Sequence, residues 1–328
     1  MNAAMRRLLH GRATVAFAFL IGVWCVFGVI NSRYLTLGNA ASITLQMSVL
    51  VLLSTGQMFA LMVRGFDISV GAVAALSSVV AALAWNQFGP IGLLAGVLTG
   101  LAAGTINGFL IARVEVQPII ATLGMLIGAR GMSLLASDSG QVIPIVEPQA
   151  MLQLAYGKWF GMAPLAWLAI GSVVLAAGLI RFTLLGRRML MLGSNPDAAR
   201  LVGMNATGVH IAAYQMTGIF ASLAGLAMLA RAGSGLPTDG AGLELQSIAS
   251  AVIGGTALAG GVASPLGTLV GSAFIQSLGS GLNMSGISPF TAEIAIGAVI
   301  IAASCVSVAP QLVSRLKNRV HKIGESRR

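Results

Sequence analysis

The sequence predicts an all-α, polytopic membrane protein with about ten transmembrane helices, and three observations support that prediction. Of its 328 residues, 56% are hydrophobic and 9% are charged, whereas about a quarter of the residues in soluble domains are charged. Four uncharged stretches, 34–63, 68–112, 201–230 and 245–292, each reach or exceed the roughly 20 residues that cross a bilayer as a helix. The basic residues lie at the ends of such stretches, so the net charge of +10 indicates membrane topology and not a nucleic-acid partner.

Charges, prolines and glycine-rich joints divide the apolar stretches into ten predicted spans. They lie near 13–31, 41–63, 68–86, 91–111, 118–137, 164–181, 209–231, 244–260, 265–284 and 289–309. We expect a single transmembrane domain over 13–309, with cytoplasmic tails at 1–12 and 310–328.

The first span follows three arginines and superficially resembles a signal peptide. No small-residue cleavage pattern closes its apolar run near Ile30, so we expect a retained first helix. Its surface around Phe19 and Trp24 is apolar on all sides, which favours a peripheral position facing lipid.

The distribution of arginine and lysine orients the spans. With the N-terminus in the cytoplasm, fifteen of the nineteen basic residues fall in inner loops and tails. Arg33, Lys158 and Arg231 fall outside, and Arg130 lies within the fifth span. Because basic residues concentrate on the cytoplasmic side of membrane proteins, we expect both termini to be cytoplasmic.

The longest inner loop, 182–208, is polar and is predicted to protrude from the membrane. It contains the sequence G-S-N-P-D-A-A-R-L-V-G from 193 to 203. Pro196 suits the first turn of a helix, Asp197 complements the positive end of that helix, and Gly203 suits its C-terminal stop. The pattern predicts a short helix, which is either a docking element or an ordinary capped surface helix.

Several strings along the chain resemble the ribose-type branch of the ATP-binding cassette (ABC) importer permeases. In the loop, Asp197, Ala198, Ala199 and Gly203 have the spacing of that family's EAA-type motif. Elsewhere the strings are RGFDISVGAVAAL from Arg64, NGFLIARVEVQPIIATLG from Asn107 and GLELQSIASAVIGGTALAGG from Gly242. The resemblance covers about 64–303, with the motifs in the family's order.

This resemblance implies a function and partners. It implies a permease subunit that carries a monosaccharide or related polar solute across the bacterial cytoplasmic membrane. Two permease subunits, in a homodimer or a heterodimer, would form the path, an ABC ATPase would grip the cytoplasmic loops, and a binding protein would deliver the sugar. The implied ATPase-coupling loop comprises Asn195, Asp197, Ala198, Ala199, Arg200 and Gly203.

Two acids depart from the family pattern. Asp197 replaces the usual Glu, and Glu293 lies in the tenth span where the family tends to be uncharged. Glu293 either faces the pathway or reaches headgroup water at the outer interface, because ionisable groups in membranes usually face a bundle interior or an aqueous cavity. The sequence leaves the identity of the solute open.

A weak internal repeat favours a transporter independently of the family. Asp67 precedes the third span as Glu244 precedes the eighth, 177 residues later. Three glycines recur with an offset of 171 residues, as Gly96 and Gly267, Gly100 and Gly271, and Gly108 and Gly279. Spans two to five and seven to ten would then form an inverted repeat, as in many transporters. Chance matches among 42 glycines are the alternative.

The two acids at the helix starts have a default role and a functional alternative. Asp67 and Glu244 can accept backbone N–H bonds and offset the positive helix ends, or they can contact the substrate. The eighth span is short and contains Gly254, Gly255, Gly260 and Gly261. We expect a broken helix beside the pathway, because freed backbone in a membrane must be covered by protein or water.

Polar side chains within the spans are candidates for the solute pathway. The candidate pathway residues are Asn107, Glu244, Ser247, Gln276, Asn283 and Glu293. Amides both donate and accept hydrogen bonds and so suit sugar hydroxyls, while hydrogen bonding between helices is their alternative use.

The sequence contains no catalytic constellation. It lacks G-x-x-x-x-G-K-[ST], its three histidines lack metal-ligand spacing, and Cys25 and Cys305 are far apart. We therefore expect no enzyme activity, cofactor or metal in this chain, with ATP hydrolysed by a partner. A self-sufficient secondary transporter, which would place more ionisable groups within its spans, and a membrane scaffold without a solute path are the competing interpretations.

Overall fold

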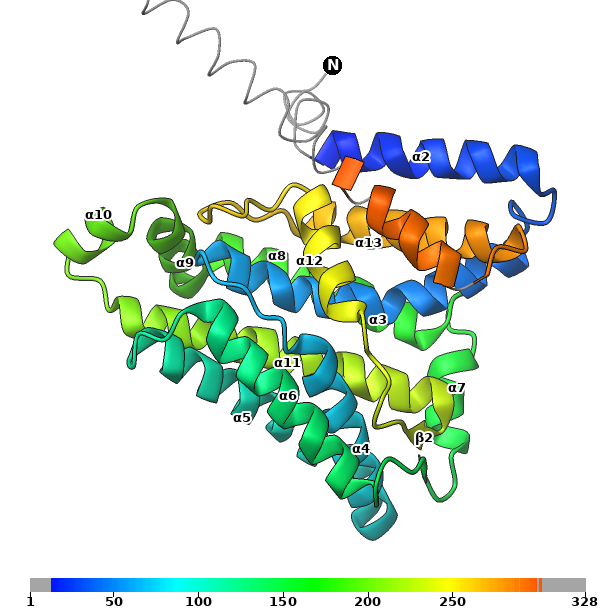
Figure 1. Ribbon diagram of the computed structural model, residues 1–328, viewed down its shortest axis with the longest axis horizontal. Coiled ribbons are helices and arrows are strands. Elements are labelled where there is room, and N and C mark those ends of the chain that lie inside the picture. Colours follow the sequence, from blue (N-terminus) through cyan, green and yellow to red (C-terminus); the bar gives the residue numbers. More distant parts are fainter. Residues whose placement is uncertain (1–12, 289, 300, 303–328) are drawn as a thin grey trace, which may run out of the picture.

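The computed structural model describes residues 13–288, 290–299 and 301–302 as a bundle of helices. Its elements are α2 (Ala13–Ile30), α3 (Leu37–Met62), α4 (Val70–Phe88), η1 (Gly89–Gly92), α5 (Leu93–Ala112), α6 (Pro118–Ala136), β1 (Ile143–Pro144), α7 (Gln149–Tyr156), α8 (Pro164–Phe182), α9 (Leu184–Ser194), α10 (Pro196–Leu201), α11 (Ala206–Ala232), β2 (Ser234–Gly235), α12 (Leu243–Ile253) and α13 (Pro265–Met284). The helices α9 and α10 lie at one end of the bundle, and α7 and β2 lie at the other (Figure 1). The predicted all-α class is confirmed; the single short ladder pairs β1 with β2 among the described residues.

Five helical stretches are long and apolar enough to cross a membrane, and 70–112, which contains α4 and α5, counts as one of them. Thr14–Ile30, Leu243–Ile253 and Phe290–Val299 are apolar but shorter. The chain is therefore a multi-pass membrane protein in composition and length, while the number of ten spans stays a prediction. The predicted tails, 1–12 and 310–328, lie outside the described residues, as does the end of the tenth span.

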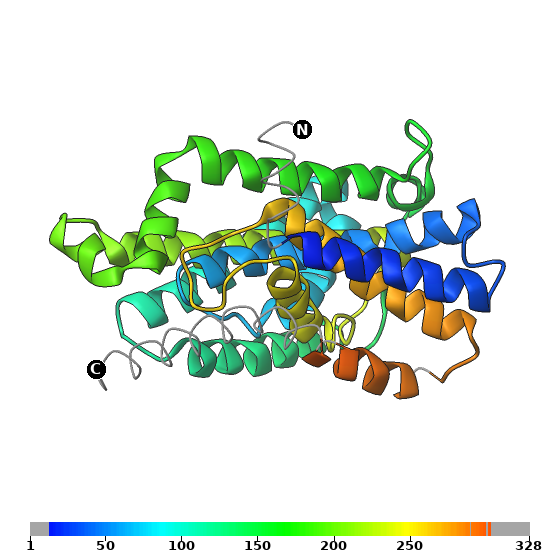
Figure 2. The ribbon, with the colours of Figure 1, turned by 90° about the horizontal axis from the view of Figure 1, so that it is seen from above.

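The centre of the bundle consists of α3, α4 and α11. Every residue of α3 from Ser48 to Met62 is buried, and α11 packs against α3, α4, α5 and the outer helix α7. By contrast, α6 buries only Ala121, Thr122, Ala129 and Ser133. The helix α8 covers one side of this centre, while α6 and the helix that begins at Phe290 lie on the opposite side (Figure 2).

Glycines allow the central helices to approach one another closely. A methyl group added at Gly104 in α5 would overlap the carbonyl oxygen of Tyr214 in α11. One added at Gly218 in α11 would overlap the carbonyl oxygen of Gly100 in α5. Small residues at such interfaces let backbones pack tightly where lipid supplies no hydrophobic drive.

The eighth span differs from its predicted form. The helix α12 ends at Ile253, seven residues before the expected end at 260, and Gly254 and Gly255 terminate it rather than interrupt it. The break precedes the helix, where 237–242 form turns. Gly255, Gly260 and Gly261 have positive φ angles of 98°, 82° and 73°, a region that glycine enters without steric cost. They turn the chain back toward the end of α3.

The first span, α2, is peripheral as predicted, but only one of its faces is exposed. Its buried face, with Ala16 and Phe27, packs against α13, and Trp24 donates a hydrogen bond to the hydroxyl of Ser277 (3.0 Å). Phe17, Val26 and Val29 are exposed on the other side. One face of this helix therefore remains available to lipid.

Candidate functional site

Two helices begin deep inside the bundle, from opposite ends. After α3 ends at Met62, the chain turns back, and Asp67 lies beside Gln57, more than one helical turn before the end of α3. The amide of Gln57, in the orientation that satisfies both groups, donates to the backbone oxygen of Asp67 (2.9 Å) and accepts from its N–H (3.2 Å). From the other end, the chain after β2 runs inward along α4, with Gly235 beside Val79 and Gly240 beside Gly71. The helix α12 then begins at Leu243, near the start of α4 (Figure 1).

The first helix start is closed by a polar cluster around Asp67. Its side chain is 2% exposed and accepts hydrogen bonds from the N–H (2.9 Å) and the hydroxyl of Ser69. The amide nitrogen of Asn107 in α5 donates to the hydroxyl of Ser69 (3.1 Å) and, at 3.4 Å, to the second carboxylate oxygen. Tyr214 in α11 donates to the backbone oxygen of Phe66 (3.2 Å). Asp67 therefore satisfies the N–H of Ser69, the residue that precedes α4, and its capping role at the positive helix end stays a prediction.

The second helix start is less closed. Glu244 lies in the first turn of α12 and is half-buried. Its Oε2 is buried and has no hydrogen-bond partner among the described residues. Asn107 likewise has a buried Oδ1 without a partner there. Buried polar atoms are usually paired, so these two acceptors are candidates for a ligand, an ion or water.

The two helix starts touch through glycine backbone. A methyl group at Gly71 would overlap the carbonyl oxygen of Gly240 and lie 2.5 Å from Oε2 of Glu244. One at Gly240 would lie 2.6 Å from the carbonyl oxygen of Gly71. The structure thus places Glu244 beside Gly71, four residues after Asp67 in the chain.

The remaining candidate pathway residues lie apart from this contact. Ser247 is buried in α12 and donates to the backbone oxygen of Glu244 (2.7 Å). Gln276 in α13 is half-buried and donates to the side chain of Gln46 in α3 (2.9 Å). Asn283 and Glu293 are exposed. The structure brings Asn107 and Glu244 to the neighbouring helix starts and leaves the last three elsewhere.

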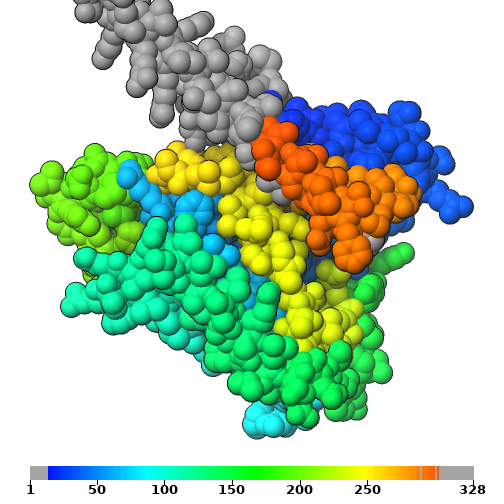
Figure 3. Space-filling model, viewed as in Figure 1, coloured from blue at the N-terminus to red at the C-terminus, as the bar shows by residue number. Residues whose placement is uncertain are grey.

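The front face of the bundle presents α12 between α6 and the helix from Phe290 (Figure 3). Leu245, next to Glu244, is 63% exposed on α12. On α6, Ile120 and Ile127 are 60% and 70% exposed. This face therefore combines apolar side chains with the half-buried carboxylate at the start of α12.

The predicted cytoplasmic helix is present as α10. Asn195 is its N-cap and accepts a hydrogen bond from the N–H of Ala198 (3.0 Å), and Pro196 and Asp197 occupy its first turn. Ala199 is buried, whereas Asp197 and Arg200 are exposed. Gly203 follows the helix with φ of 71° and open space around it. The short helix predicted from Pro196, Asp197 and Gly203 is confirmed.

Sequence reasoning missed the helix α9 and the contacts of Arg64 at this end of the bundle. The Nε of Arg64 donates to the carbonyl oxygen of Gly193 (2.7 Å), and Nη2 donates to that of Ser194 (2.9 Å). Gly193 also lies so close to Met62 that a methyl group there would overlap its carbonyl oxygen. The arginine in the string RGFDISVG was the available signal, since a charge at a helix end often satisfies backbone carbonyls.

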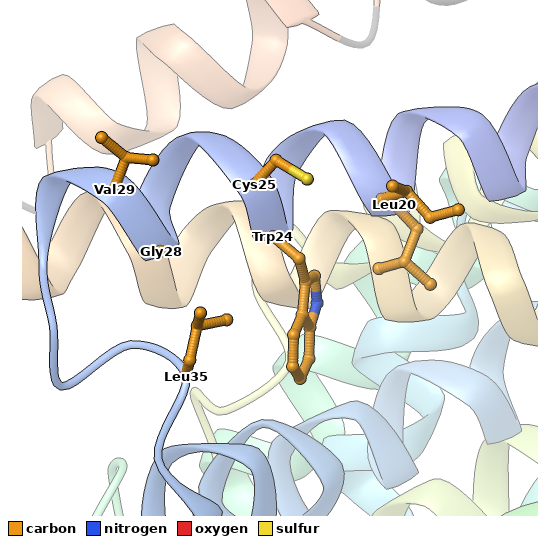
Figure 4. Close-up of a pocket in the computed structure, with 7 residues that line it drawn as sticks. Leu20, Trp24, Cys25, Gly28, Val29 and Leu35 are labelled. Atoms are coloured by element: carbon orange, nitrogen blue, oxygen red, sulfur yellow. The ribbon is translucent and has the colours of Figure 1, made fainter.

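A groove of about 550 Å³ on α2 differs from the helix-start contact in its chemistry. Leu20, Trp24, Cys25, Val29 and Leu35 line it, together with Gly28 and Ile21 (Figure 4). Apart from the indole N–H, which bonds to Ser277, this lining offers a polar solute little to bind. Acyl chains suit it better, because the groove lies on the exposed side of a peripheral helix.

Metal ligation has no support among the residues that the structure describes, where no group of three or more His, Cys, Asp or Glu side chains forms a metal-binding cluster.

Comparison with known proteins gives consistent matches. Residues 39–304 match the model of a family described as branched-chain amino acid transport system / permease component. The chain is 34% identical to the ribose import permease of Escherichia coli K12 over 304 residues, 91% of this chain and 94% of that protein. It is 31% identical to the autoinducer 2 import system permease of Photorhabdus luminescens, with 86% of each chain covered. It is also 31% identical to the L-arabinose transport system permease of E. coli K12, over 88% of this chain and 87% of that protein. No solved structure matches the chain significantly.

Proposed function

The chain belongs to the branched-chain amino acid transport system / permease component family, and on that premise we propose that it is the permease subunit of an ABC importer for a monosaccharide or related polar solute. The family membership predicted from the sequence motifs is confirmed. The observation that carries the proposal is the pairing of a capped short helix, α10, with two helices, α4 and α12, whose starts meet inside the bundle.

The proposed partners follow from what the chain contains. It has no phosphate-binding loop, so a separate ABC ATPase supplies the energy and docks at the coupling loop, Asn195 to Gly203. A binding protein delivers the solute at the other end of the bundle, near α7. A second copy of this chain, or a homologous permease, completes the pathway.

The proposed orientation places α9 and α10 in the cytoplasm and α7 outside, in a bacterial inner membrane. The bias of basic residues toward the inner loops supports it. The exposed Trp159 and Phe160, which follow α7, support it as well, because aromatic side chains are enriched at membrane interfaces. Both termini would then be cytoplasmic.

The proposed pathway runs along the face formed by α6, α12 and the helix from Phe290. Glu244, half-buried at the start of α12, is next to the exposed Leu245 of this face, and discontinuous helices in transporters border the solute site. Asn107 contributes through the cluster beside it, and Ser247 through its bond to the backbone of Glu244. Gln276, Asn283 and Glu293 would contribute nearer the ends of the path. A second subunit would cover the exposed apolar side chains of this face.

An inverted repeat is part of the proposal, and equivalent contacts support it. A methyl group at Gly96 in α5 would approach the carbonyl oxygen of Ser77 in α4 to 2.8 Å. Offsets of 171 and 177 residues map this contact onto Gly267 in α13 and Gly254 after α12, where a methyl group on Gly267 would overlap the carbonyl oxygen of Gly254. The helix α11 packs on α4 and α5 as α3 packs on α12 and α13. In this proposal each repeat supplies one of the two helices, α4 and α12, that begin inside the bundle.

Reconstitution tests the proposal. Proteoliposomes would hold the chain with the ATPase and binding protein encoded beside it, and radiolabelled D-ribose and L-arabinose would be the probes, chosen from the names of the relatives. We expect uptake of at least one probe. This uptake should require both ATP on the side of the membrane where the ATPase is bound and the binding protein. Accumulation driven by a proton or sodium gradient, without the ATPase, would replace the proposal with the secondary-transporter interpretation.

The coupling loop can be tested in the same system. Gly203→Leu forces a side chain into a left-handed conformation, at a cost of roughly 1–2 kcal/mol, while the surrounding space is open. We expect normal insertion and ATP hydrolysis with reduced uptake per ATP. Gly171→Leu, at an open position in α8, on the side of the bundle opposite the proposed pathway (Figure 2), is the matched control. Unaltered coupling in Gly203→Leu would count against the role of this loop.

A further inference from the structure

Three chain segments meet at the cytoplasmic end of the bundle, around the end of α9. The first is the end of α3, where the carbonyl oxygen of Met62 accepts a hydrogen bond from the N–H of Gly261 (2.9 Å). The second is Gly193 and Ser194, the last residues of α9. The third is the loop at Gly260 and Gly261, where a methyl group on either glycine would overlap a side-chain atom of Arg64 or Ser194. The packing has no room for an added side chain at these glycines.

Arg64 holds the first segment to the second. Its guanidinium bridges two consecutive carbonyl oxygens, of Gly193 at 2.7 Å and of Ser194 at 2.9 Å. These are the last carbonyls of α9, which a cation stabilises. The backbone of Arg64 has φ of 63°, a left-handed conformation that a non-glycine residue adopts only where its surroundings require it. Two residues after Ser194, at Pro196, the helix α10 begins.

From Arg64 the chain reaches the start of α4 through a short segment that is hydrogen-bonded along its length. The segment 64–69 can span at most about 20 Å when fully extended. It is held at successive residues, through the N–H of Gly65 to Ala60 (2.9 Å), Tyr214 to Phe66 (3.2 Å), and Gln57 to both backbone groups of Asp67. A displacement of Arg64 along the segment therefore reaches Ser69 and the N-terminus of α4.

The helix α12 also connects to the end of α9. From Gly261 the loop leads back to Gly254, which ends α12. Within this loop, the N–H of Thr256 bonds to Ala251 (3.0 Å) and the N–H of Gly260 bonds to Ala257 (3.0 Å). The end of α9 is therefore linked by short, hydrogen-bonded segments to both helices that meet at Gly71 and Gly240.

We propose that Arg64 is a positioning residue that transmits movement of α9 and α10 to the contact between α4 and α12. The proposal rests on the proposed function, in which α10 is the element that the ATPase moves. The shape of the side chain supports it, since the planar fork of arginine can bridge two carbonyl oxygens, whereas lysine presents one flexible ammonium. A positive charge on the cytoplasmic side alone would not require this geometry.

The chain offers a matched control in Arg113. This arginine follows α5 at the same end of the bundle, is exposed, and makes no side-chain hydrogen bond among the described residues. Arg113→Ala removes the same topological charge as Arg64→Ala without removing a bridge between segments. A difference between the two variants therefore reports on the bridge.

The experiment uses the reconstituted complex with its ATPase and binding protein. The chain would carry Cys25→Ser and Cys305→Ser, which removes both native cysteines, and Leu245→Cys on the exposed side of α12 as a reporter. Its reaction rate with a water-soluble thiol reagent is measured at rest and with ADP–vanadate trapped on the ATPase. The basal ATPase rate and the stimulation by the binding protein are measured in parallel.

In the parent chain and in Arg113→Ala, we expect trapping to change the thiol reaction rate severalfold. In Arg64→Ala we expect a basal ATPase rate within twofold of the parent, no change in thiol reactivity on trapping, and loss of stimulation. Arg64→Lys, which also serves if Arg64→Ala fails to insert, should retain part of the response.

A full response in Arg64→Ala, or in Arg64→Lys if only that variant inserts, would overturn the proposal. Loss of basal ATPase activity with an unchanged effect of trapping on the thiol reaction rate would overturn it as well. Arg64 would then serve only the docking of the ATPase. A parent chain that binds no ATPase would instead refute the proposed function.

Discussion

The starts of α4 and α12 have the same design but differ in how their acids are held. Asp67 is 2% exposed, and its carboxylate accepts hydrogen bonds from Ser69 and Asn107. Glu244 is half-buried, and its buried Oε2 has no partner among the described residues. A saturated carboxylate stabilises the fold, whereas one with free acceptor capacity can bind something else. On this difference rests our proposal that the first acid serves structure and the second serves the solute.

The largest expected effect comes from removing the saturated acid. Asp67→Ala leaves the N–H and the hydroxyl of Ser69 without their acceptor in a buried site, and each unsatisfied group costs roughly 1–3 kcal/mol. We expect the free energy of unfolding to fall by about 3 kcal/mol in total. Thermal unfolding of the purified protein in detergent measures the change. A cost for Glu244→Ala as large as that for Asp67→Ala would remove the distinction between the two acids.

The contact between the two helix starts is expected to be the next most sensitive. Gly71→Ala places a methyl group against the backbone oxygen of Gly240, which cannot rotate away. Overpacking of this kind costs about 1–3 kcal/mol. Gly124→Ala, where nothing lies within 4 Å, is the control and should not destabilise the protein, because alanine favours a helix over glycine. Equal melting temperatures for the two variants would show that the contact is loose.

A smaller effect is expected within the polar cluster. Ser69→Ala removes one hydroxyl that bonds to Asp67 and accepts from Asn107, but it keeps the backbone N–H bond to the carboxylate. We expect a loss of about 1 kcal/mol in the free energy of unfolding, typical of one buried hydrogen bond. The same thermal assay checks it. Ser247→Ala in α12, which removes a bond to the backbone oxygen of Glu244, is the comparison, and a larger loss there would place the structural cluster at α12.

The smallest effect on stability is expected at Glu244. Glu244→Gln keeps the size of the side chain and removes its charge, so the free energy of unfolding should change by less than about 0.5 kcal/mol. Uptake of a transported sugar should nevertheless fall severalfold, because the proposed pathway loses a charge and one of two acceptor oxygens becomes a donor amide. Transport in proteoliposomes at several solute concentrations provides the measurement. Wild-type uptake by Glu244→Gln would assign this acid a capping role like that of Asp67.

Local patterns in the sequence predicted some elements closely. The predicted span 265–284 coincides with α13, because Ser264 and Pro265 form a complete N-terminal signal. The short helix near Asp197 and its stop at Gly203 were predicted for the same reason. Helix α9 and the ordered outer segment with β1 and α7 were missed, since their hydrophobic pattern is too short to distinguish from a loop.

The sequence by itself determined that this chain lies in a membrane, which family it belongs to, and that acids mark the starts of two spans. These properties depend on composition, charge distribution and residue order, which need no knowledge of distant contacts. Only the tertiary structure decided that the break in the eighth span precedes α12, that Gly71 meets Gly240, and that Arg64 bridges to the end of α9. These contacts join residues that are far apart in the chain, with Arg64 and Gly193 separated by 129 positions. No local pattern encodes such a distance, because it depends on how the glycine faces of several helices pack together.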